Sequence, residues 1–223
     1  CAVLEVGLGG RLDTVNLIDA DCVIITPIGL DHQDFLGPDI DSIAMEKSAV
    51  MRPSTPVVCT EENPPQVLLK AARKLAAPVY RRGRDFDIIS SKGSQKQQLS
   101  FSISGHSIEL ERAAMPGQHQ LDNLAAALAG LLIMYPDGDS ETGKLSKAIA
   151  ECRVTGRLQR FSRSPQILLD VGHNELAAQA IAEYMAQANS AKITCVLAML
   201  ADKSAEAVAL ALNHVCRRWL CSE

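Results

Sequence analysis

Short apolar runs rich in valine and isoleucine alternate along the chain with longer stretches in which apolar residues recur at helical spacing. The runs are typical of buried parallel strands, and the alternation predicts an α/β fold in which helices cover mostly parallel sheets. The expected strands are residues 1–6, 22–28, 56–59, 166–171 and 193–200, and the expected helices are residues 41–51, 64–76, 118–134, 143–151, 174–188 and 203–214.

The middle of the chain follows a different pattern. Residues 86–91 and 97–113 alternate between polar and apolar positions, which predicts antiparallel strands, and the sequence SGHS at residues 104–107 is typical of a hairpin turn. Regular periodicity is lost over residues 154–166, where Gly, Arg, Ser and Pro accumulate. This loss indicates a boundary between two domains.

We therefore predict a first domain at residues 1–153, a linker at residues 154–164 and a second α/β domain at residues 165–223. The chain begins inside an apolar run without an initiator methionine, and it ends shortly after another apolar run begins. We expect both ends to be cut from a longer protein, so that the first domain lacks its start and the second its end.

The composition excludes some partners. The formal net charge is -4 and Lys and Arg are not clustered, so we expect neither nucleic acid nor a membrane surface to bind. The seven cysteines form no C-x-x-C pair and lie mostly in apolar runs, which favours buried thiols in a reducing compartment. No signal peptide or membrane span is recognisable, so we expect a cytoplasmic protein.

The sequence EVGLGGRLDTVN, residues 5–16, holds the first candidate site. Glu5 ends the first expected strand, at the edge where α/β sheets bind ligands, and Gly7, Gly9 and Gly10 permit close approach of the backbone. A tight turn beside a solvated Glu5 explains the stretch equally well. Leu12 stands where a dinucleotide-binding fingerprint needs its third glycine, so an NAD site is not favoured.

The next expected strand leads into GLDHQDFLG, which places Asp31 and His32 at the same edge as Glu5. A carboxylate and an imidazole there suit Mg²⁺ or Mn²⁺, although a histidine after a strand is often a simple hydrogen-bonding loop residue. In the helix that follows, we expect Ser42 as the N-cap and Pro53 beyond the end. Lys47 is either solvated or close to the Asp31 loop.

Two further stretches resemble nucleotide sites. The helix expected at residues 118–134 has polar residues at its start, so that His119, Gln120 and Asn123 either contact a nucleotide or cap the helix. Residues 138–145, GDSETGKL, nearly match a phosphate-binding loop. A helix and not a strand precedes them, and leucine replaces the hydroxyl residue, so we interpret them as a surface connection.

The second domain offers a separate group of polar residues. Arg157 lies in the expected linker and supplies a positive charge suited to phosphate, while Asp170, His173 and Asn174 follow a strand and lead into a helix. These side chains are either aimed across an interdomain cleft or, in the case of Asn174, serve only as an N-cap.

Seven motifs in this order carry a resemblance to a known family: EVGLGGRLDTVN, ITPIGLDHQDFLG, EKSAVMRP, PGQHQLDNLAAALA, GRLQRF, LLDVGHN and LAMLADKS. The chain resembles folylpolyglutamate synthases, in particular the bacterial bifunctional dihydrofolate synthase type, within the Mur ligase superfamily. The resemblance implies a Mur-ligase-type ATP-binding domain without its start, followed by part of a Rossmann-like C-terminal α/β domain.

The resemblance also implies roles for particular residues. Glu5 and His32 would hold Mg²⁺ with ATP, and Lys47, which is often carbamylated in such enzymes, would assist a second Mg²⁺ site; K⁺ or Mn²⁺ are the other cations expected. Lys47 and His173 would be catalytic. The remaining roles are ATP binding by Asn123, Arg157 and Asp170 and pterin binding by Leu12, Asp13 and Thr14.

The implied reaction joins L-glutamate to dihydropteroate or to reduced folates, through an acyl phosphate made from ATP, in a monomeric enzyme. A Mur-type peptidoglycan ligase and a non-catalytic nucleotide-binding fragment are the alternatives. The phosphate-binding loop expected before Glu5 is absent, and Ser48 and Val171 stand where we expected other small residues. We therefore expect the 223-residue chain by itself not to turn over ATP.

Overall fold

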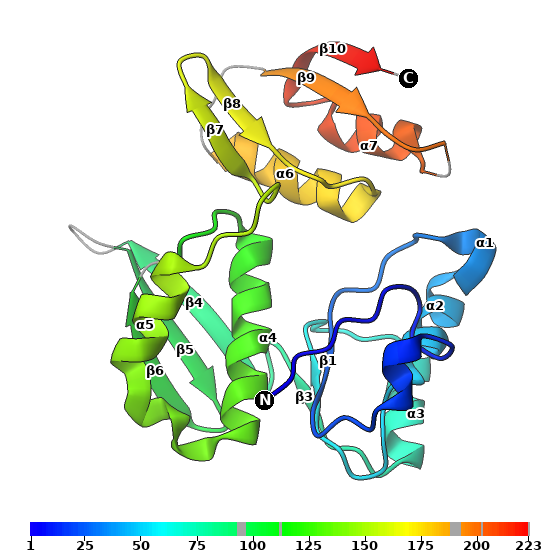
Figure 1. Ribbon diagram of the computed structural model, residues 1–223, viewed down its shortest axis with the longest axis vertical. Helices are drawn as coiled ribbons and strands as arrows, with labels where there is room; N and C mark the ends of the chain where they lie inside the picture. Colours follow the sequence, from blue (N-terminus) through cyan, green and yellow to red (C-terminus); the bar gives the residue numbers. More distant parts are fainter. Residues whose placement is uncertain (93–96, 112, 188–192, 202, 223) are drawn as a thin grey trace. The chain divides into compact units, whose positions relative to one another are not determined.

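The computed structural model describes residues 1–92, 97–111, 113–187, 193–201 and 203–222. The chain divides into two compact units, one made of residues 1–112 and 122–149 and the other of residues 113–121 and 150–223. Parallel and antiparallel sheets are combined with helices in a mixed α/β fold (Figure 1). The expected fold class is confirmed.

A three-stranded parallel sheet organises the first unit. Its strands are β1 (Val23–Ile25), β2 (Val57–Cys59) and β3 (Val79–Arg81), with β2 in the centre and buried at every residue. Consecutive apolar residues suit β2 because a central parallel strand is covered on both faces. The helices α2 (Ile40–Ser48) and α3 (Gln66–Lys74) contribute to the core through Ile43, Ala44, Leu68 and Ala72.

Helix α2 begins differently from our expectation. Its N-cap is Asp39 and not Ser42, because the Asp39 carboxylate accepts a hydrogen bond from the Ser42 backbone N–H at 2.8 Å. This hydrogen bond lowers the pKa of Asp39. The helix ends at Ser48, well before Pro53, and the buried Ser48 hydroxyl donates to the Ala44 carbonyl oxygen at 2.6 Å.

The antiparallel strands lie where the alternating pattern predicts them. They are β4 (Phe86–Lys92), β5 (Gln97–Ile103) and β6 (His106–Glu111), paired in the order β4-β5-β6. Ser104 and Gly105 form the turn between β5 and β6 with positive φ angles of 49° and 85°, which is typical of a two-residue hairpin. The predicted turn is confirmed.

Three further helices are α4 (Gln118–Met134), η2 (Pro136–Glu141) and α5 (Thr142–Glu151), of which residues 122–149 belong to the first unit. Helix α4 packs closely on β1, since a Cβ atom at Gly130 would lie 3.1 Å from Ile24 Cδ1. The stretch that resembles a phosphate-binding loop runs from η2 into α5, with Lys144 ion-paired to Glu141 at 2.8 Å. Its interpretation as a surface connection is confirmed.

The second unit combines a hairpin with a β/α layer. The strands β7 (Gln159–Arg163) and β8 (Gln166–Leu169) are antiparallel, whereas β9 (Ile193–Ala198) and β10 (Cys216–Ser222) are parallel. Helices α6 (Glu175–Gln187) and α7 (Ala205–Leu212) pack together beside β9 and β10 (Figure 1). Their shared core contains Ala178, Ala182, Val208, Leu212 and Cys216.

Several local expectations are wrong. Residues 1–6 are not a strand: Val3 is 94% exposed, and within the described residues no neighbouring strand pairs with this segment. Strand β7 lies inside the expected linker; it has no buried residue, so its sequence lacks the apolar signal of a strand. The strand β3 and the short helices η1 (Thr14–Leu17) and α1 (Gln33–Leu36) were not predicted.

The cysteines only partly follow expectation. All seven thiols are free, but Cys1, Cys152 and Cys221 are exposed while Cys59 and Cys216 are buried. In the part of the chain that the structure describes, no helix combines the length and apolar character needed to cross a membrane.

The packing of α3 predicts a clear difference between two helix substitutions. Leu68 is 0% exposed and Met45 on α2 is 63% exposed. We expect Leu68→Ala to lower the free energy of unfolding by about 3 kcal/mol, because it leaves a cavity in the core. Met45→Ala should change it by less than about 0.5 kcal/mol. Urea denaturation of both variants tests this, and equal destabilisation would contradict the described core.

Candidate active site

The glycine-rich loop lies directly against helix α2. A Cβ atom at Gly10 would be 2.7 Å from the Glu46 carbonyl oxygen and 3.3 Å from Lys47 Cα, and the Arg11 N–H donates to that same carbonyl at 3.1 Å. Gly9 has a φ of +68° and would place a Cβ atom 2.8 Å from Leu36. Glycine is therefore required for the loop to reach the backbone beside Lys47.

Asp13 closes this loop through its side chain. One carboxylate oxygen accepts from the backbone N–H groups of Gly7 at 2.9 Å and Leu8 at 3.2 Å, and the other accepts from Val15 at 2.9 Å as the N-cap of η1. These hydrogen bonds, above all the one from Val15, lower the pKa of Asp13. Asp13, for which the resemblance implies pterin binding, thus shapes the loop through both of its carboxylate oxygens.

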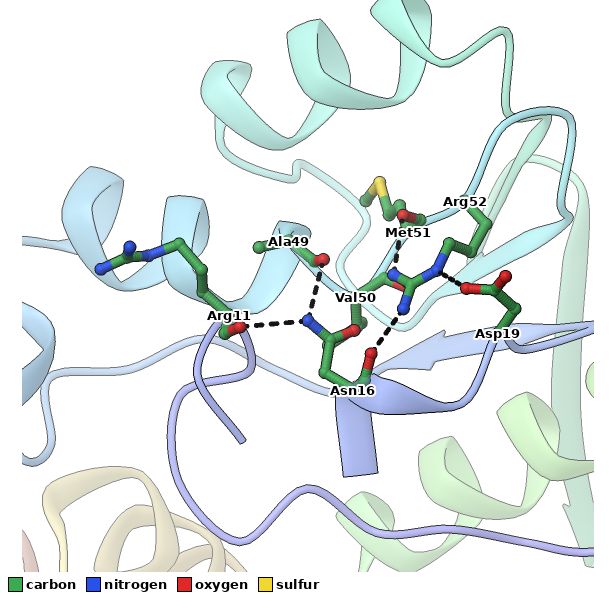
Figure 2. A network of polar contacts seen from close by, with 7 residues as sticks. All are labelled: Arg11, Asn16, Asp19, Ala49, Val50, Met51 and Arg52. Carbon is green, nitrogen blue, oxygen red and sulfur yellow. Dashed lines mark hydrogen bonds and ion pairs between the residues drawn. The ribbon is translucent and has the colours of Figure 1, made fainter. Parts of the chain in front are cut away.

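A network of polar contacts fastens the far end of the loop to the residues that follow α2 (Figure 2). The Arg52 guanidinium donates to the Asn16 carbonyl oxygen at 2.7 Å and forms an ion pair with Asp19. The Asn16 side-chain amide donates in turn to the carbonyl oxygens of Arg11 at 3.2 Å and Ala49 at 3.4 Å. Together these bonds hold Arg11 and Asn16 of the loop against the residues that follow α2.

Lys47 lies in the last turn of α2, directly under the glycine-rich loop, and is partly buried. The side chain of its neighbour Glu46 also contacts the loop, because Arg11 Nε lies 2.9 Å from the Glu46 carboxylate. The loop therefore covers the backbone at Lys47. The sequence did not predict this contact, because we expected Lys47 to be either solvated or close to the Asp31 loop.

His32 and Asp31 lie together in the loop that follows β1. The imidazole Nε2 is 3.8 Å from Asp31 Oδ1, and the same oxygen accepts from the His32 backbone N–H at 2.9 Å. His32 has a positive φ of 51° just before α1. Such a backbone is unusual for a residue other than glycine and is often found at functional sites.

Sequence reasoning missed Glu61, which holds this loop in place. Glu61 follows β2, and its carboxylate accepts from the Ile28 backbone N–H at 2.9 Å. The preceding Thr60 donates from its N–H and its hydroxyl to the Ile25 carbonyl oxygen. An acidic residue directly after a buried strand, at the edge where such sheets bind ligands, was the available signal.

The donors at this edge fit a divalent cation that takes few ligands from the protein. Asp31 and His32 supply oxygen and nitrogen donors. Among the described residues, however, no three His, Cys, Asp or Glu side chains come close enough together to hold a metal ion. Mg²⁺ commonly binds in this way, because one or two side chains suffice when substrate phosphates and water complete its shell.

Among the other expected residues, Glu5, Leu12, Thr14 and Asn123 are exposed. Glu5 lies in the irregular segment before the loop, and Leu12 and Thr14 flank Asp13. Asn123 is exposed in the second turn of α4, so it cannot be the cap of that helix. The buried Gln120 lies beside His119, with 3.0 Å between their Nε2 atoms.

In the second unit, Asp170 repeats the role of Asp13. It follows β8 and accepts from the backbone N–H groups of Leu158 at 2.8 Å and Gly172 at 2.7 Å. Val171 packs closely against Gly156, since a Cβ atom at Gly156 would lie 2.6 Å from a Val171 methyl group. Asp170 thus fixes the turn that presents the exposed Arg157.

His173 and Asn174 have different surroundings. The exposed His173 places Nδ1 3.1 Å from the Val171 carbonyl oxygen. The Asn174 side chain accepts from the Ala177 N–H at 3.0 Å, at the start of α6. The N-cap role expected as one alternative for Asn174 is confirmed.

Comparisons with known proteins identify the family of this chain. Residues 1–131 match the Mur ligase middle domain, and residues 156–223 match the Mur ligase glutamate ligase domain. The chain belongs to the Mur ligase family. This Mur ligase chain is 34% identical to dihydrofolate synthase/folylpolyglutamate synthase of Haemophilus influenzae, over 98% of its own length and 52% of that protein.

Solved structures show the same relationship. The Mycobacterium tuberculosis folylpolyglutamate synthase complexed with ADP and AMPPCP has a TM-score of 0.86 at 29% identity, over 97% of this chain and 51% of that one. Escherichia coli FolC in complex with DHPP and ADP has a TM-score of 0.80 at 34% identity, over 96% and 50%. This Mur ligase chain spans about half the length of the curated relatives it matches.

The contact between Gly10 and α2 predicts a strong effect of a single methyl group. We expect Gly10→Ala to lower the free energy of unfolding by about 2 kcal/mol, because the new Cβ atom overlaps the Glu46 carbonyl oxygen and the backbone must move. Gly143→Ala in α5 is the matched control, since nothing lies within 4 Å of its Cβ position. The control should stabilise the protein by at most about 1 kcal/mol. Thermal unfolding of both variants measures the difference, and a harmless Gly10→Ala would refute the contact.

The lowered pKa of Asp13 predicts a pH-dependent effect on stability. Because the folded state favours the charged carboxylate, its contribution is complete above the ordinary pKa of aspartate, about 3.9, and is lost as the pH falls through the lower folded value. Asp13→Asn removes this contribution. The difference in melting temperature between wild type and variant should therefore be largest at neutral pH and shrink towards about pH 3. A difference that is independent of pH would contradict the role of the charged carboxylate.

Proposed function

We propose that the protein containing this chain is an ATP-dependent ligase that forms an amide between L-glutamate and dihydropteroate or a reduced folate. The observation that carries the proposal is the 34% identity to a dihydrofolate synthase/folylpolyglutamate synthase over 98% of the chain. Further support comes from Escherichia coli FolC, a structural neighbour solved with DHPP and ADP.

The chemistry follows from the poor reactivity of a carboxylate towards an amine. A carboxylate oxygen of the pteroate or folate attacks the γ-phosphorus of ATP, and ADP leaves with the electrons of the broken P–O bond. The glutamate nitrogen, deprotonated to the neutral amine, then attacks the acyl carbon, expels phosphate and loses one more proton to solvent, which yields the amide. Positioning and neutralisation of charge dominate such phosphoryl transfer.

Glu5 and His32 would hold the divalent cation with ATP, which is the role that family resemblance gives them. When bound, the cation neutralises negative charge on the phosphates of the nucleotide. The proposal includes Mg²⁺ as this ion; the Yersinia pestis relative was solved with AMPPNP and Mn. Lys47, under the glycine-rich loop, and His173 are the residues for which we propose catalytic roles.

The geometry refines the proposed roles of two acidic residues. Asp13 and Asp170 both direct their carboxylate oxygens at backbone N–H groups. We therefore assign them to positioning: Asp13 fixes the loop that presents Leu12 and Thr14 to the pterin. Asp170 fixes the turn that presents Arg157, for which we propose ATP binding, as we do for Asn123.

The proposal also concerns the state of the whole protein. A reaction that consumes ATP and folate precursors fits a cytoplasmic enzyme. We propose a monomer, which is the state that the family resemblance implies. Size-exclusion chromatography with light scattering measures the oligomeric state directly.

Phosphate release by the complete polypeptide that contains these 223 residues tests the function. With ATP, Mg²⁺ and L-glutamate present, we expect release with dihydropteroate, with tetrahydrofolate, or with both, and none without a pterin. Release only with a UDP-muramyl substrate would contradict the folate assignment. No release with any acceptor would support a non-catalytic nucleotide-binding protein.

A variant pair tests the assignment of Arg157 in the same assay. Arg157→Ala should lower kcat/KM for ATP at least about tenfold, because a positive charge near the phosphates is lost. Arg160→Ala on β7 removes an equally exposed arginine from the same segment and should have little effect. Equal activity of the two variants would remove Arg157 from the site.

A further inference from the structure

Arg82 lies at a junction of four elements in the first unit and has no role in the proposed chemistry. It follows β3 directly, and its backbone N–H donates to the Cys59 carbonyl oxygen at the end of β2 at 3.0 Å. The next residue, Gly83, has a φ of +73° and turns the chain towards β4. Its missing side chain leaves space for Glu62, whose Cγ would be 3.2 Å from a Cβ atom there.

The Arg82 guanidinium faces three carboxylates that come from different elements. Its Nη2 is 3.2 Å from Asp122 Oδ1 on α4 and 3.7 Å from Glu62 Oε1 after β2, and its Nε is 3.6 Å from Asp87 Oδ1 on β4. The Nε atom is buried and makes no hydrogen bond to the described residues. Charge attraction, and not a full set of hydrogen bonds, therefore holds the guanidinium in this place.

The pair between Arg82 and Asp122 is the strongest of the three. The side chains of Arg82 and Asp122 are 21% and 20% exposed, whereas those of Asp87 and Glu62 are 41% and 59% exposed. Solvent screens the two outer pairs more, so their contribution is smaller. Without Arg82, the half-buried Asp122 would face two other carboxylates and the start of α4 would be repelled from the sheet.

We infer that Arg82 is a positioning residue for nucleotide binding, acting through Asp122 on Asn123. The inference rests on the proposed function of Asn123 as an ATP contact. Asp122 and Asn123 are consecutive on α4, about 100° apart around the helix axis. Asp122 is partly buried at Arg82 while Asn123 is exposed, so the ion pair fixes the rotation of the helix that presents Asn123.

Kinetics of the complete polypeptide test the inference. Arg82→Gln should raise KM for ATP about tenfold with less than about a twofold change in kcat, because chemistry proceeds once the nucleotide is bound. Asp122→Asn should do the same, and the double variant should be no worse than either single one, since both break one interaction. Arg82→Lys should restore part of the affinity because it keeps the charge.

Arg84→Gln is the matched control. Arg84 lies two residues further along; it is ion-paired with Asp85 at 2.5 Å and donates to the Val79 carbonyl oxygen at 2.9 Å, so its loss should leave KM for ATP unchanged. A lower melting temperature of Arg82→Gln with unchanged KM for ATP would overturn the inference and leave Arg82 as a contributor to fold stability only. An equal rise of KM in Arg84→Gln would overturn it as well.

Calorimetric titration with ADP separates this inference from the proposed function, because it requires no folate turnover. Weaker ADP binding by Arg82→Gln than by wild type supports the positioning role, whatever acceptor substrate the enzyme uses. Equal ADP affinity in the two proteins overturns that role even if folate-dependent phosphate release is observed.

Discussion

The close approach of Gly10 to the backbone of α2 is the contact on which the candidate site depends. No Cβ atom fits between the loop and the Glu46 carbonyl oxygen, so the path of the loop is set by the helix and not by its own flexibility. Asp13 then fixes the curve of the loop, and Arg52 fastens its far end. The geometry around Lys47 follows from these contacts.

The two units use the same device at their candidate sites. In each unit, an aspartate at a glycine-containing turn accepts hydrogen bonds from two or more backbone N–H groups. Asp13 accepts from Gly7 among others, and Asp170 accepts from Gly172. A carboxylate whose two oxygens both accept backbone N–H groups is well placed to organise a loop. An acidic residue within a family motif is therefore not by that fact alone a ligand contact.

Sequence periodicity was sufficient where local physics determines the structure. Helix α4 was predicted with its observed bounds because its apolar pattern is long, and the hairpin turn at Ser104 followed from residues that tolerate positive φ. The strand predicted at residues 1–6 was wrong because a strand needs a neighbouring strand to pair with, and the sequence does not reveal whether one is present. The prediction of Ser42 as the N-cap of α2 was wrong because Asp39, three residues earlier, is an equally good capping residue by type.

The candidate site, like the fold, was only partly predictable from the sequence. Motif order identified the family and the candidate residues. The hydrogen bond from Ile28 to Glu61 and the ion pairs of Arg82, however, join residues that are distant in sequence, so the sequence did not predict them.

The central claim, that ATP activates a pterin-linked carboxylate, is tested most directly with carboxylate labelled by ¹⁸O. The account predicts that the released phosphate carries one labelled oxygen for each amide formed. Unlabelled phosphate in the presence of amide product would contradict it.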